Sequence, residues 1–285
     1  MNIEVFEKHL KLFTKYCTPV SLTDVLSNKS LPPNPVVLTF DDGYKNNYKY
    51  AFPLLKKYKV PATIFITTGF IDQNSYIWTD RLEFILDNGS NKNIDVTWEN
   101  KRLELELSTD EQKVKTINNI KNYLKSLAES EKLIFLDQLQ ETLEIDYNWD
   151  RIPAVLSPLT WNEIREMKES GLISIGSHTV THPMLSKCTY EQQGRELKFS
   201  RQRIVEELKE DCVLFAYPNG KQVDYNQETI RLLKESGYLL AVTTNIGYVD
   251  STSRDNIQLN RFGTDITLEA LGMVVTKMSR LVGTI

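Results

Sequence analysis

Two short stretches of the sequence carry the residue types of a hydrolytic metal site. His178 and His182 are two of only three histidines in the chain, and they lie four residues apart in the segment Ser177–Pro183. Histidines with this spacing can direct both imidazoles toward one ion if the segment makes a helical turn, although two hydrogen-bonded loop histidines show the same pattern. Far upstream, Asp41 and Asp42 are adjacent carboxylates, which repel each other unless a cation or strong hydrogen-bond donors offset the repulsion.

Both stretches come just after an apolar run that is typical of a buried parallel strand. Asp41 follows residues 36–40, and His178 follows the predicted strand 172–175. In a β/α barrel the carboxyl ends of the strands form one face, so we expect the aspartates and histidines to meet there. Two histidines and one carboxylate leave positions open on a hydrolytic zinc ion, and the other carboxylate would activate water. Asp-Asp-Gly is also common as a turn or helix cap, but that use does not account for the histidine pair.

The predicted elements alternate between strands and helices. An amphipathic helix is expected over residues 3–16, and a strand–helix–strand unit over residues 36–66, with its second strand at residues 62–66. After residue 158 the alternation returns, with helices predicted at 161–170, 190–209, 227–236 and 268–281 and strands at 172–175, 213–216, 239–243 and 257–262. Six strands alternating with helices favour an α/β fold with a closed or nearly closed barrel, and a doubly wound open sheet is the alternative.

Between about residues 76 and 158 this rhythm is interrupted. Residues 96–107 resemble a polar hairpin with Glu99 and Asn100 near its turn, and charged helices are expected over residues 109–142. We interpret 76–158 as an insertion packed on the barrel, so that residues 1–285 form a single domain. The insertion would wall off the substrate groove or mediate a homo-oligomer. Four aromatic residues could stack on sugar rings, although packing is the more common role for such side chains: Trp78, Trp98, Tyr147 and Trp149.

Composition excludes several classes of protein. A net charge of −4 and a hydrophobic fraction of 41% fit an ordinary globular protein and argue against a nucleic-acid-binding protein. No apolar run is long enough for a membrane span, and the absence of an apolar leader in the given sequence predicts a cytoplasmic location. Cys17, Cys188 and Cys212 are widely spaced, which favours free thiols. His9 lies in a polar stretch and is predicted at the surface.

The residues Thr39–Gly43, taken together with Ser177–His182, resemble the first two motifs of the polysaccharide deacetylases, the NodB-homology or carbohydrate esterase 4 family. The resemblance covers roughly residues 30–75 and 158–265. It implies a distorted (β/α)7-type barrel that binds one divalent metal ion, expected to be zinc, and that removes N-acetyl groups from amino sugars. By this resemblance Asp41 would be the catalytic base, and the metal ligands would be Asp42, His178 and His182.

The third motif departs from the family pattern. Where the family has Arg-x-Pro-Tyr, this chain reads Ala216-Tyr217-Pro218-Asn219-Gly220. The four residues 217–220 are predicted to bind substrate, and the backbone N–H of Asn219 would complete an oxyanion hole. The arginine that orients the base aspartate is replaced by Ala216. Arg261, at the end of the last predicted strand, is our predicted substitute, and Arg254 is the weaker choice.

The fifth motif departs further, because the family supplies a histidine there as general acid. The corresponding stretch 267–271 offers only Glu269. Another group would then protonate the leaving amine, or Asp41 would return the proton it took, or catalysis would be lost. Three hypotheses follow: a deacetylase of an amino sugar or polysaccharide intermediate, a catalytically impaired carbohydrate-binding protein that keeps the metal, and an amidohydrolase acting on a formamide or a cyclic amide.

Overall fold

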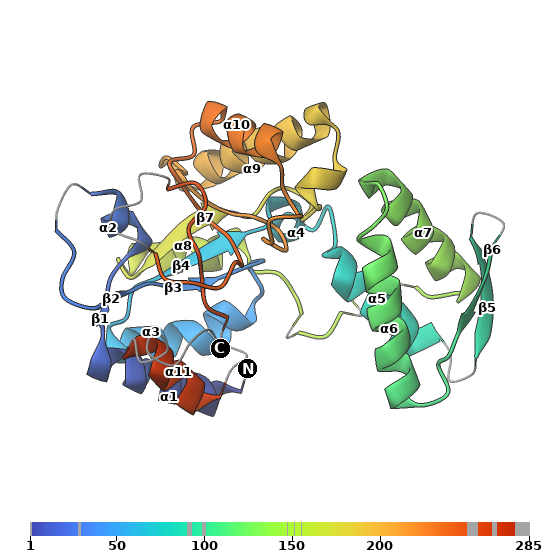
Figure 1. The fold of residues 1–285 in the computed structure, drawn as a ribbon, viewed down its shortest axis with the longest axis horizontal. Helices are drawn as coiled ribbons and strands as arrows, with labels where there is room; N and C mark the ends of the chain where they lie inside the picture. Colours follow the sequence, from blue (N-terminus) through green and yellow to red (C-terminus); the bar gives the residue numbers. More distant parts are fainter. Residues whose placement is uncertain are drawn as a thin grey trace.

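The structure is a computed structural model that describes residues 2–27, 30–89, 93–98, 101–146, 148–150, 152–154, 156–249, 256–263 and 267–276. At its centre is a curled parallel sheet in the order β3–β4–β7–β8–β9 (Figure 1). The strand bounds are β3 Leu38–Phe40, β4 Ala62–Ile66, β7 Ile173–Ser177, β8 Leu214–Ala216 and β9 Leu240–Val242. The strands are neighbours in chain order without a reversal, as in a barrel, whereas a doubly wound sheet reverses its order at a switch point. The prediction of a distorted α/β barrel is therefore confirmed over the doubly wound alternative.

The apolar sequence of the central strands follows from their position in the sheet. β4 pairs in parallel with β3 on one side, where Leu38 faces Ala62, and with β7 on the other, where Ala62 faces Ile173. Every residue of β4 is buried, because both faces of the sheet are covered. A strand buried on both faces has no polar side to alternate with, which is why residues 62–66 are apolar apart from the small, fully buried Thr63.

The strand predicted at 257–262 is wrong. Leu259 forms a single parallel bridge with Val242 at the edge of the sheet, and no strand is formed there in the described part, residues 256–263. Pairing stops because the next backbone donor in line, the N–H of Arg261, bonds to the carbonyl of Asn245 in the loop after β9 at 3.0 Å. The segment thus leaves the sheet and carries Arg261 toward the carboxyl ends of the strands.

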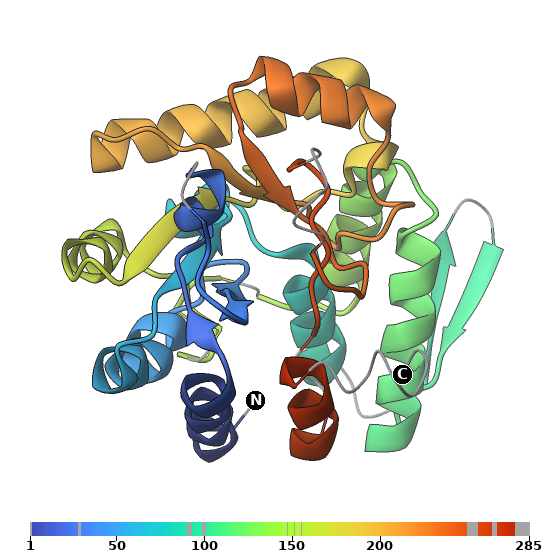
Figure 2. The ribbon, with the colours of Figure 1, turned by 60° about the vertical axis from the view of Figure 1, so that its left-hand side comes forward.

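Helices surround the outside of the curled sheet, which Figure 2 shows from a second direction. They are α1 Ile3–Tyr16, α2 Leu22–Leu26, α3 Phe52–Tyr58 after a π-helical turn at Asn47–Ala51, α4 Thr68–Ile71, α8 Trp161–Glu169, α9 Tyr190–Leu208, α10 Gln227–Glu235 and α11 Leu268–Val275; a 3₁₀ turn spans Leu185–Lys187. Side chains of Thr160, Thr189 and Asn226 form capping boxes that fix where α8, α9 and α10 begin. A small parallel pair, β1 Thr18–Pro19 with β2 Pro35–Val36, leads into β3. The part of the predicted last helix beyond residue 276 lies outside the described residues.

His9 differs from its predicted surface position. Its side chain is fully buried on the face of α1 that also carries Leu10 and Phe13. This face is covered because α1 packs against both α3 and α11. Neither ring nitrogen of His9 has a hydrogen-bond partner among the residues that the structure describes.

The insertion lies beside the barrel in Figure 1 and has an apolar core of its own. It contains α5 Trp78–Gly89, an antiparallel hairpin of β5 Ile94–Trp98 and β6 Lys101–Leu105, α6 Asp110–Leu124 and α7 Glu129–Thr142. Trp78 and Trp98 are 2% and 7% exposed in this core, so packing is their role, and they are not available to stack on a sugar. The hairpin turn at residues 99 and 100 and the side chain of Tyr147 lie outside the described residues.

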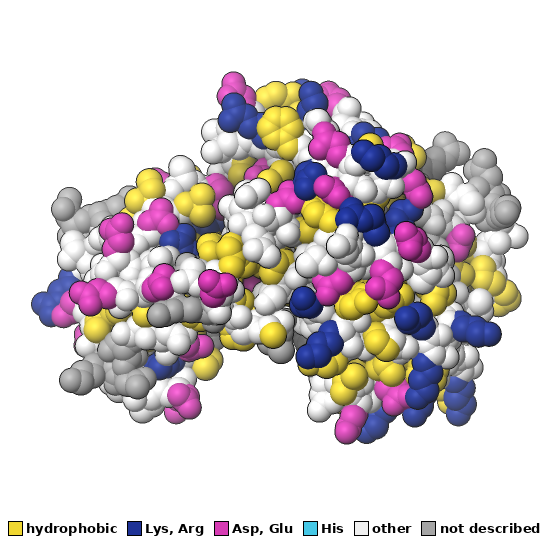
Figure 3. Space-filling view, turned by 180° about the vertical axis from the view of Figure 1, so that it is seen from behind, with side chains coloured by type: hydrophobic (Ala, Val, Ile, Leu, Met, Phe, Trp, Pro, Cys, Tyr) yellow, Lys and Arg dark blue, Asp and Glu magenta, His cyan; other side chains and the backbone are white. Residues whose placement is uncertain are grey.

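The surface carries acidic and basic side chains interspersed with each other on the face seen in Figure 3, with no broad region of one sign. Its outline is indented at the lower edge between the insertion and the barrel. Among the described residues, no helix combines the length and apolar character that a membrane crossing requires.

Candidate active site

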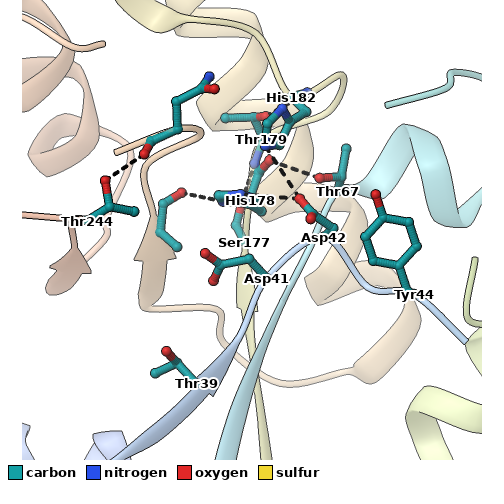
Figure 4. A network of polar contacts seen from close by, with 12 residues as sticks. Thr39, Asp41, Asp42, Tyr44, Thr67, Ser177, His178, Thr179, His182 and Thr244 are labelled. Atoms are coloured by element: carbon teal, nitrogen blue, oxygen red, sulfur yellow. Dashed lines mark hydrogen bonds and ion pairs between the residues drawn. The ribbon is translucent and has the colours of Figure 1, made fainter. Parts of the chain in front are cut away.

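The two aspartates lie in a tight turn at the carboxyl end of β3. Asp42 has a φ of 73° and Gly43 a φ of 89°, both in the left-handed region, and the Gly43 N–H donates to the Asp41 carbonyl at 2.9 Å. The Asp42 carbonyl in turn accepts from the N–H of Thr67 after β4 at 3.1 Å. This reversal turns the neighbouring carboxylates in different directions, as Figure 4 shows. They are therefore free to serve separate functions.

The histidine loop, residues 178–182, follows β7 without forming the helical turn that the i, i+4 spacing suggested. The His178 N–H donates to the Ile66 carbonyl of β4 at 2.9 Å, which anchors the start of the loop to the sheet. Thr179 and His182 have φ values of 70° and 59°. Left-handed conformations cost non-glycine residues about 1–2 kcal/mol each, and they persist only where surrounding contacts fix them. The imidazoles meet through this loop, with ring centroids 4.9 Å apart.

Asp42, His178 and His182 each offer one atom that could bind a metal ion, and these three atoms all lie within 4.8 Å of one another. Asp42 Oδ1 lies 3.5 Å from His178 Nε2 and 3.4 Å from His182 Nε2. Two ligands bound tetrahedrally at 2.0–2.1 Å are about 3.3–3.4 Å apart, so these separations suit a shared ion. Asp42 Oδ1 has no hydrogen-bond partner of good geometry among the described residues although it is buried, which also fits a cation. The donor set therefore fits a divalent metal ion.

A backbone contact selects which nitrogen of His178 faces the aspartate. Its Nδ1 is 2.7 Å from the carbonyl oxygen of Ala216 at the end of β8. In neutral imidazole this geometry places the proton on Nδ1 and leaves the lone pair on Nε2, the atom that faces Asp42. Outer contacts of this kind fix the tautomer and the ring orientation of metal-binding histidines.

Burial shifts the titration of all three residues toward their neutral forms. It raises the pKa of Asp42 to about 6 and lowers the pKa of His182 to about 4. Burial also lowers the pKa of His178 below its ordinary value. Neutral imidazole is the form that binds a metal. A carboxyl group held in such surroundings would regain its charge beside a divalent cation.

Arg261 lies against Asp41 in a bidentate ion pair. Its Nη1 donates to Asp41 Oδ1 and its Nη2 to Asp41 Oδ2, each at 2.8 Å. The guanidinium is itself fixed, because Nε donates to the Thr243 carbonyl at 2.7 Å and Nη1 to Thr39 Oγ1 at 3.1 Å. Burial alone would raise the pKa of Asp41, but the charge and hydrogen bonds of Arg261, together with the neighbouring His178 and His182, outweigh this effect and hold that pKa below its usual range. The weaker choice, Arg254, lies outside the described residues.

The loop after β8 is placed at the site only in part. Asn219 has a φ of 58°, and its carbonyl accepts from Thr244 Oγ1 at 2.6 Å, in the contact network of Figure 4. Pro218 and Gly220 are buried within the same turn. The structure does not bring the Tyr217 side chain to the site: it is 1% exposed, stacks on Tyr225 and donates to the Ile257 carbonyl at 2.9 Å. An aromatic residue directly after a buried strand was read as a ligand contact, but its ring belongs to the core.

Two further contributors were not predicted from the sequence. The backbone carbonyl of Thr243 accepts a hydrogen bond from the Arg261 guanidinium, and no side-chain pattern in the sequence reveals such a contact. Glu196 on α9 accepts hydrogen bonds from the histidine loop. A signal for Glu196 was present, because it lies on the same helical stripe as the buried residues Gln193, Leu197 and Ser200. A carboxylate on a buried stripe needs partners.

The sequence of the chain is similar to a known protein family and to several curated proteins. The family model described as polysaccharide deacetylase matches residues 28–136 and 140–241. The chain is 25% identical over 255 residues to YxkH of Bacillus subtilis (strain 168), a protein whose name describes it as a polysaccharide deacetylase. The match covers 88% of this chain and 60% of YxkH. The poly-β-1,6-N-acetyl-D-glucosamine N-deacetylase of Staphylococcus aureus (strain MRSA252) is 29% identical over 137 residues, or 44% of this chain and 45% of that protein. The chain thus matches about half of the length of these curated relatives.

Solved structures show the same fold. The deacetylase PplD of Streptococcus pyogenes, solved in complex with acetate, superimposes with a TM-score of 0.59 at 23% identity, covering 92% of this chain and 80% of PplD. IcaB from Ammonifex degensii superimposes with a TM-score of 0.56 at 18% identity, covering 96% of this chain and 88% of IcaB. The insertion and the barrel are both included in matches of this extent.

Proposed function

The chain belongs to the polysaccharide deacetylase family, and from this premise we propose that it is a metal-dependent hydrolase that removes N-acetyl groups from an amino sugar. One observation carries the proposal: a carboxylate held by an arginine, Asp41, lies next to a second carboxylate, Asp42, that shares a three-donor set with His178 and His182. Separate environments for two neighbouring carboxylates are typical of a base and a metal ligand. We propose zinc as the ion, because two imidazoles and one carboxylate with open positions are the ligands of many hydrolytic zinc sites.

The residues of the chain divide the reaction between them. A divalent ion bound by Asp42, His178 and His182 would polarise the acetyl carbonyl and lower the pKa of water. Asp41 accepts the proton of the attacking water, while Arg261 holds both of its oxygens in place. The Asn219 backbone N–H would donate to the developing oxyanion, and one such donor is worth about 2.7–4 kcal/mol in comparable sites.

The proton for the leaving amine needs a source other than a third histidine. His9 is the only histidine left in the sequence, and it is buried on α1 against α3 and α11. We propose that Asp41 returns to the nitrogen the proton it took from water. A protonated carboxyl beside Arg261 gives up its proton readily, because the guanidinium favours the ionised form. The C–N bond then breaks to release a free amine and acetic acid, which ionises to acetate in solution, and Asp41 ends ionised as it began.

The substrate that we propose is an N-acetylglucosamine-containing saccharide. Support comes from the similarity to a poly-β-1,6-N-acetyl-D-glucosamine N-deacetylase over 137 residues. We therefore choose β-1,6-linked N-acetylglucosamine oligomers as the first probe, with β-1,4-linked oligomers and the monosaccharide beside them.

The test is acetate release by the full chain, stripped of metal and then loaded with zinc, with and without a chelator. We expect acetate from at least one N-acetylated saccharide, and we expect loss of that activity in the chelator and its recovery when zinc is restored. Absence of acetate from every saccharide, in protein shown to hold one zinc ion, would contradict the deacetylase. Saccharide binding without acetate would then favour the impaired carbohydrate-binding protein, and hydrolysis of a formamide or cyclic amide would favour the other amidohydrolase.

A further inference from the structure

Glu196 is a half-buried carboxylate that the proposed reaction does not use. It lies in the first half of α9, and its side chain contacts the histidine loop. Its Oε2 accepts from the backbone N–H of Val180 at 2.7 Å and from that of Thr181 at 2.9 Å. Its Oε1 accepts from Thr181 Oγ1 at 2.8 Å. One side chain thus satisfies three donors of a five-residue loop.

The other side of the histidine loop is held by α4. The N–H of Thr68 donates to the Thr179 carbonyl at 3.1 Å, and the N–H of Gly69 donates to the Val180 carbonyl at 2.8 Å. The carbonyls of Thr179 and Val180 therefore point to α4, and the amides of Val180 and Thr181 point to Glu196. The peptide planes 179–180 and 180–181, in the middle of the loop, are thus each held by α4 on the carbonyl side and by Glu196 on the amide side.

Such fixing is required because the loop has an unfavourable backbone. Thr179 and His182 both have left-handed φ values, and one of them is a proposed metal ligand. Without the acceptor supplied by Glu196, the amides of Val180 and Thr181 would lose their partners, and the loop would be free to relax toward ordinary φ values. The His182 imidazole would move with it, away from Asp42 and His178.

We propose that Glu196 is a positioning residue that holds the histidine loop in its metal-binding conformation before any ion arrives. The inference rests on the proposed function in one respect, namely that His178 and His182 bind the ion. It assigns Glu196 no contact with substrate. Its role is exerted through hydrogen bonds to residues 180 and 181, so it depends on an oxygen at the right place more than on the negative charge.

This distinction allows a rescue variant. In Glu196→Gln, the amide oxygen can accept both backbone N–H groups, and the amide nitrogen can donate to Thr181 Oγ1, which is able to accept. Glu196→Leu has a similar size and removes every acceptor. Glu206→Leu on the same helix is the matched control, because Glu206 is exposed and outside the site.

The experiment measures two properties of the full chain. The first is hydrogen exchange of the Val180 and Thr181 amides in metal-free protein. The second is zinc affinity by competition with a chromophoric chelator. For Glu196→Leu we expect loss of protection at both amides and zinc binding weakened by about 10–100-fold, the usual effect of removing an outer contact. For Glu196→Gln and Glu206→Leu we expect protection retained and affinity within about threefold of the wild type, by the same comparison.

Thermal unfolding verifies that each variant is folded, and the Gln variant decides the question if the Leu variant is not. Unchanged zinc affinity in a folded Glu196→Leu protein would overturn the proposal, as would a Gln variant as impaired as the Leu variant in both measurements. The failure of the proposed function has a different signature. If the wild type binds no zinc while Glu196→Leu alone loses amide protection, Glu196 positions the loop and the metal assignment fails.

Discussion

Asp41 and Asp42 are neighbours in the sequence whose surroundings push their titration in opposite directions. Arg261 lowers the pKa of Asp41 against the effect of burial, whereas burial raises the pKa of Asp42 to about 6. Carboxyl groups separated in this way take different parts in a reaction. The geometry supports Asp41 as the group that handles protons and Asp42 as the group that binds the ion.

At this scale, Arg261→Lys tests whether the bidentate pair matters. Lysine keeps the positive charge but cannot donate to both oxygens of Asp41 and to Thr243 and Thr39 at once. We expect kcat for acetate release to fall by about 10–100-fold with zinc content unchanged, because the base loses its orientation and the ligands do not. Arg195→Lys, at an exposed position of α9, is the control. An Arg261→Lys enzyme with wild-type kcat would remove Arg261 from the site.

Which residues of the site could be predicted depended on how local their signal is. The aspartates and histidines stand next to apolar runs and were found as motifs. Arg261 was found because one arginine was missing at Ala216 and another had to replace it. The partner in Thr243 is a backbone carbonyl, and Glu196 lies on a charged helix where a carboxylate is ordinary. Such contacts depend on tertiary packing, which the sequence does not spell out locally.

Among the elements, the turn after β3 makes the strictest demand on the sequence. Gly43 has a φ of 89°, and a Cβ there would lie 2.9 Å from Ile71 Cδ1 and 3.1 Å from Ile66 Cγ2. Gly171 after α8 has a φ of 73° but open space around it. A side chain at Gly171 would therefore cause backbone strain alone, whereas a side chain at Gly43 would cause both backbone strain and a steric clash.

We expect Gly171→Ala to lower the free energy of unfolding by about 1 kcal/mol, from backbone strain alone. Gly43→Ala should lower it further, because Ile66 and Ile71 must move, and it should reduce acetate release by displacing both carboxylates. Denaturant unfolding and acetate assays of the two variants check this. Equal stability losses, with full activity in Gly43→Ala, would show that the turn tolerates a side chain.

The first helix carries a pH dependence of stability through His9. Burial lowers the pKa of His9 below its ordinary 6.5, so the unfolded chain takes up a proton before the folded chain does. The stability contributed by keeping His9 neutral is therefore present above about pH 6.5 and is lost as the pH falls through the lowered folded value. We expect His9→Leu to lose less stability than the wild type between pH 7 and pH 5, since leucine has no proton to bind.

Thermal unfolding at several pH values measures this difference. Because His178 and His182 also have lowered pKa values, a smaller acid loss remains in the variant. An exposed change on the same helix, Lys8→Ala, is the control and should leave the wild-type profile in place. Identical acid profiles for His9→Leu and the wild type would mean that His9 does not titrate in this window.

Helices and strands were predicted correctly where the spacing of apolar residues in the sequence matches the faces that are buried in the structure. The run at 62–66 was predicted with its observed bounds, and α1 with bounds of 3–16. His9 was misplaced because it is a polar residue that follows Glu7 and Lys8, whereas α1 is covered on two sides, by α3 and by α11. The strand at 257–262 was predicted from its composition, yet it pairs with β9 only around Leu259, and the next N–H, that of Arg261, donates to Asn245 in the loop after β9. Local pattern does not reveal where a neighbouring segment offers better partners.

The whole molecule combines a half-barrel that carries the site with an insertion that has its own core. The interruption of the strand–helix rhythm placed the insertion at about 76–158, and the hairpin and α6–α7 were found within it. Helix α5 was not predicted, since its sequence mixes apolar and charged residues with a glycine at its end. A buried pair, Lys132 with Glu129 at 2.6 Å, lies on the first turns of α7. Burial is the main cause of the lowered pKa of His182, and the positive charge of Lys132 lowers that pKa further.

The account as a whole depends on one division of labour, in which Asp42 and the two histidines hold a metal ion and Asp41 transfers the proton. Zinc content and acetate release of Asp41→Asn, measured on the same preparation as the wild type, test it most directly. The account predicts one zinc ion per chain in both proteins and acetate release lower in the variant by about 10²–10⁴-fold, the usual contribution of a general base. Asp41→Asn with substantial turnover, or with its zinc lost, would contradict it.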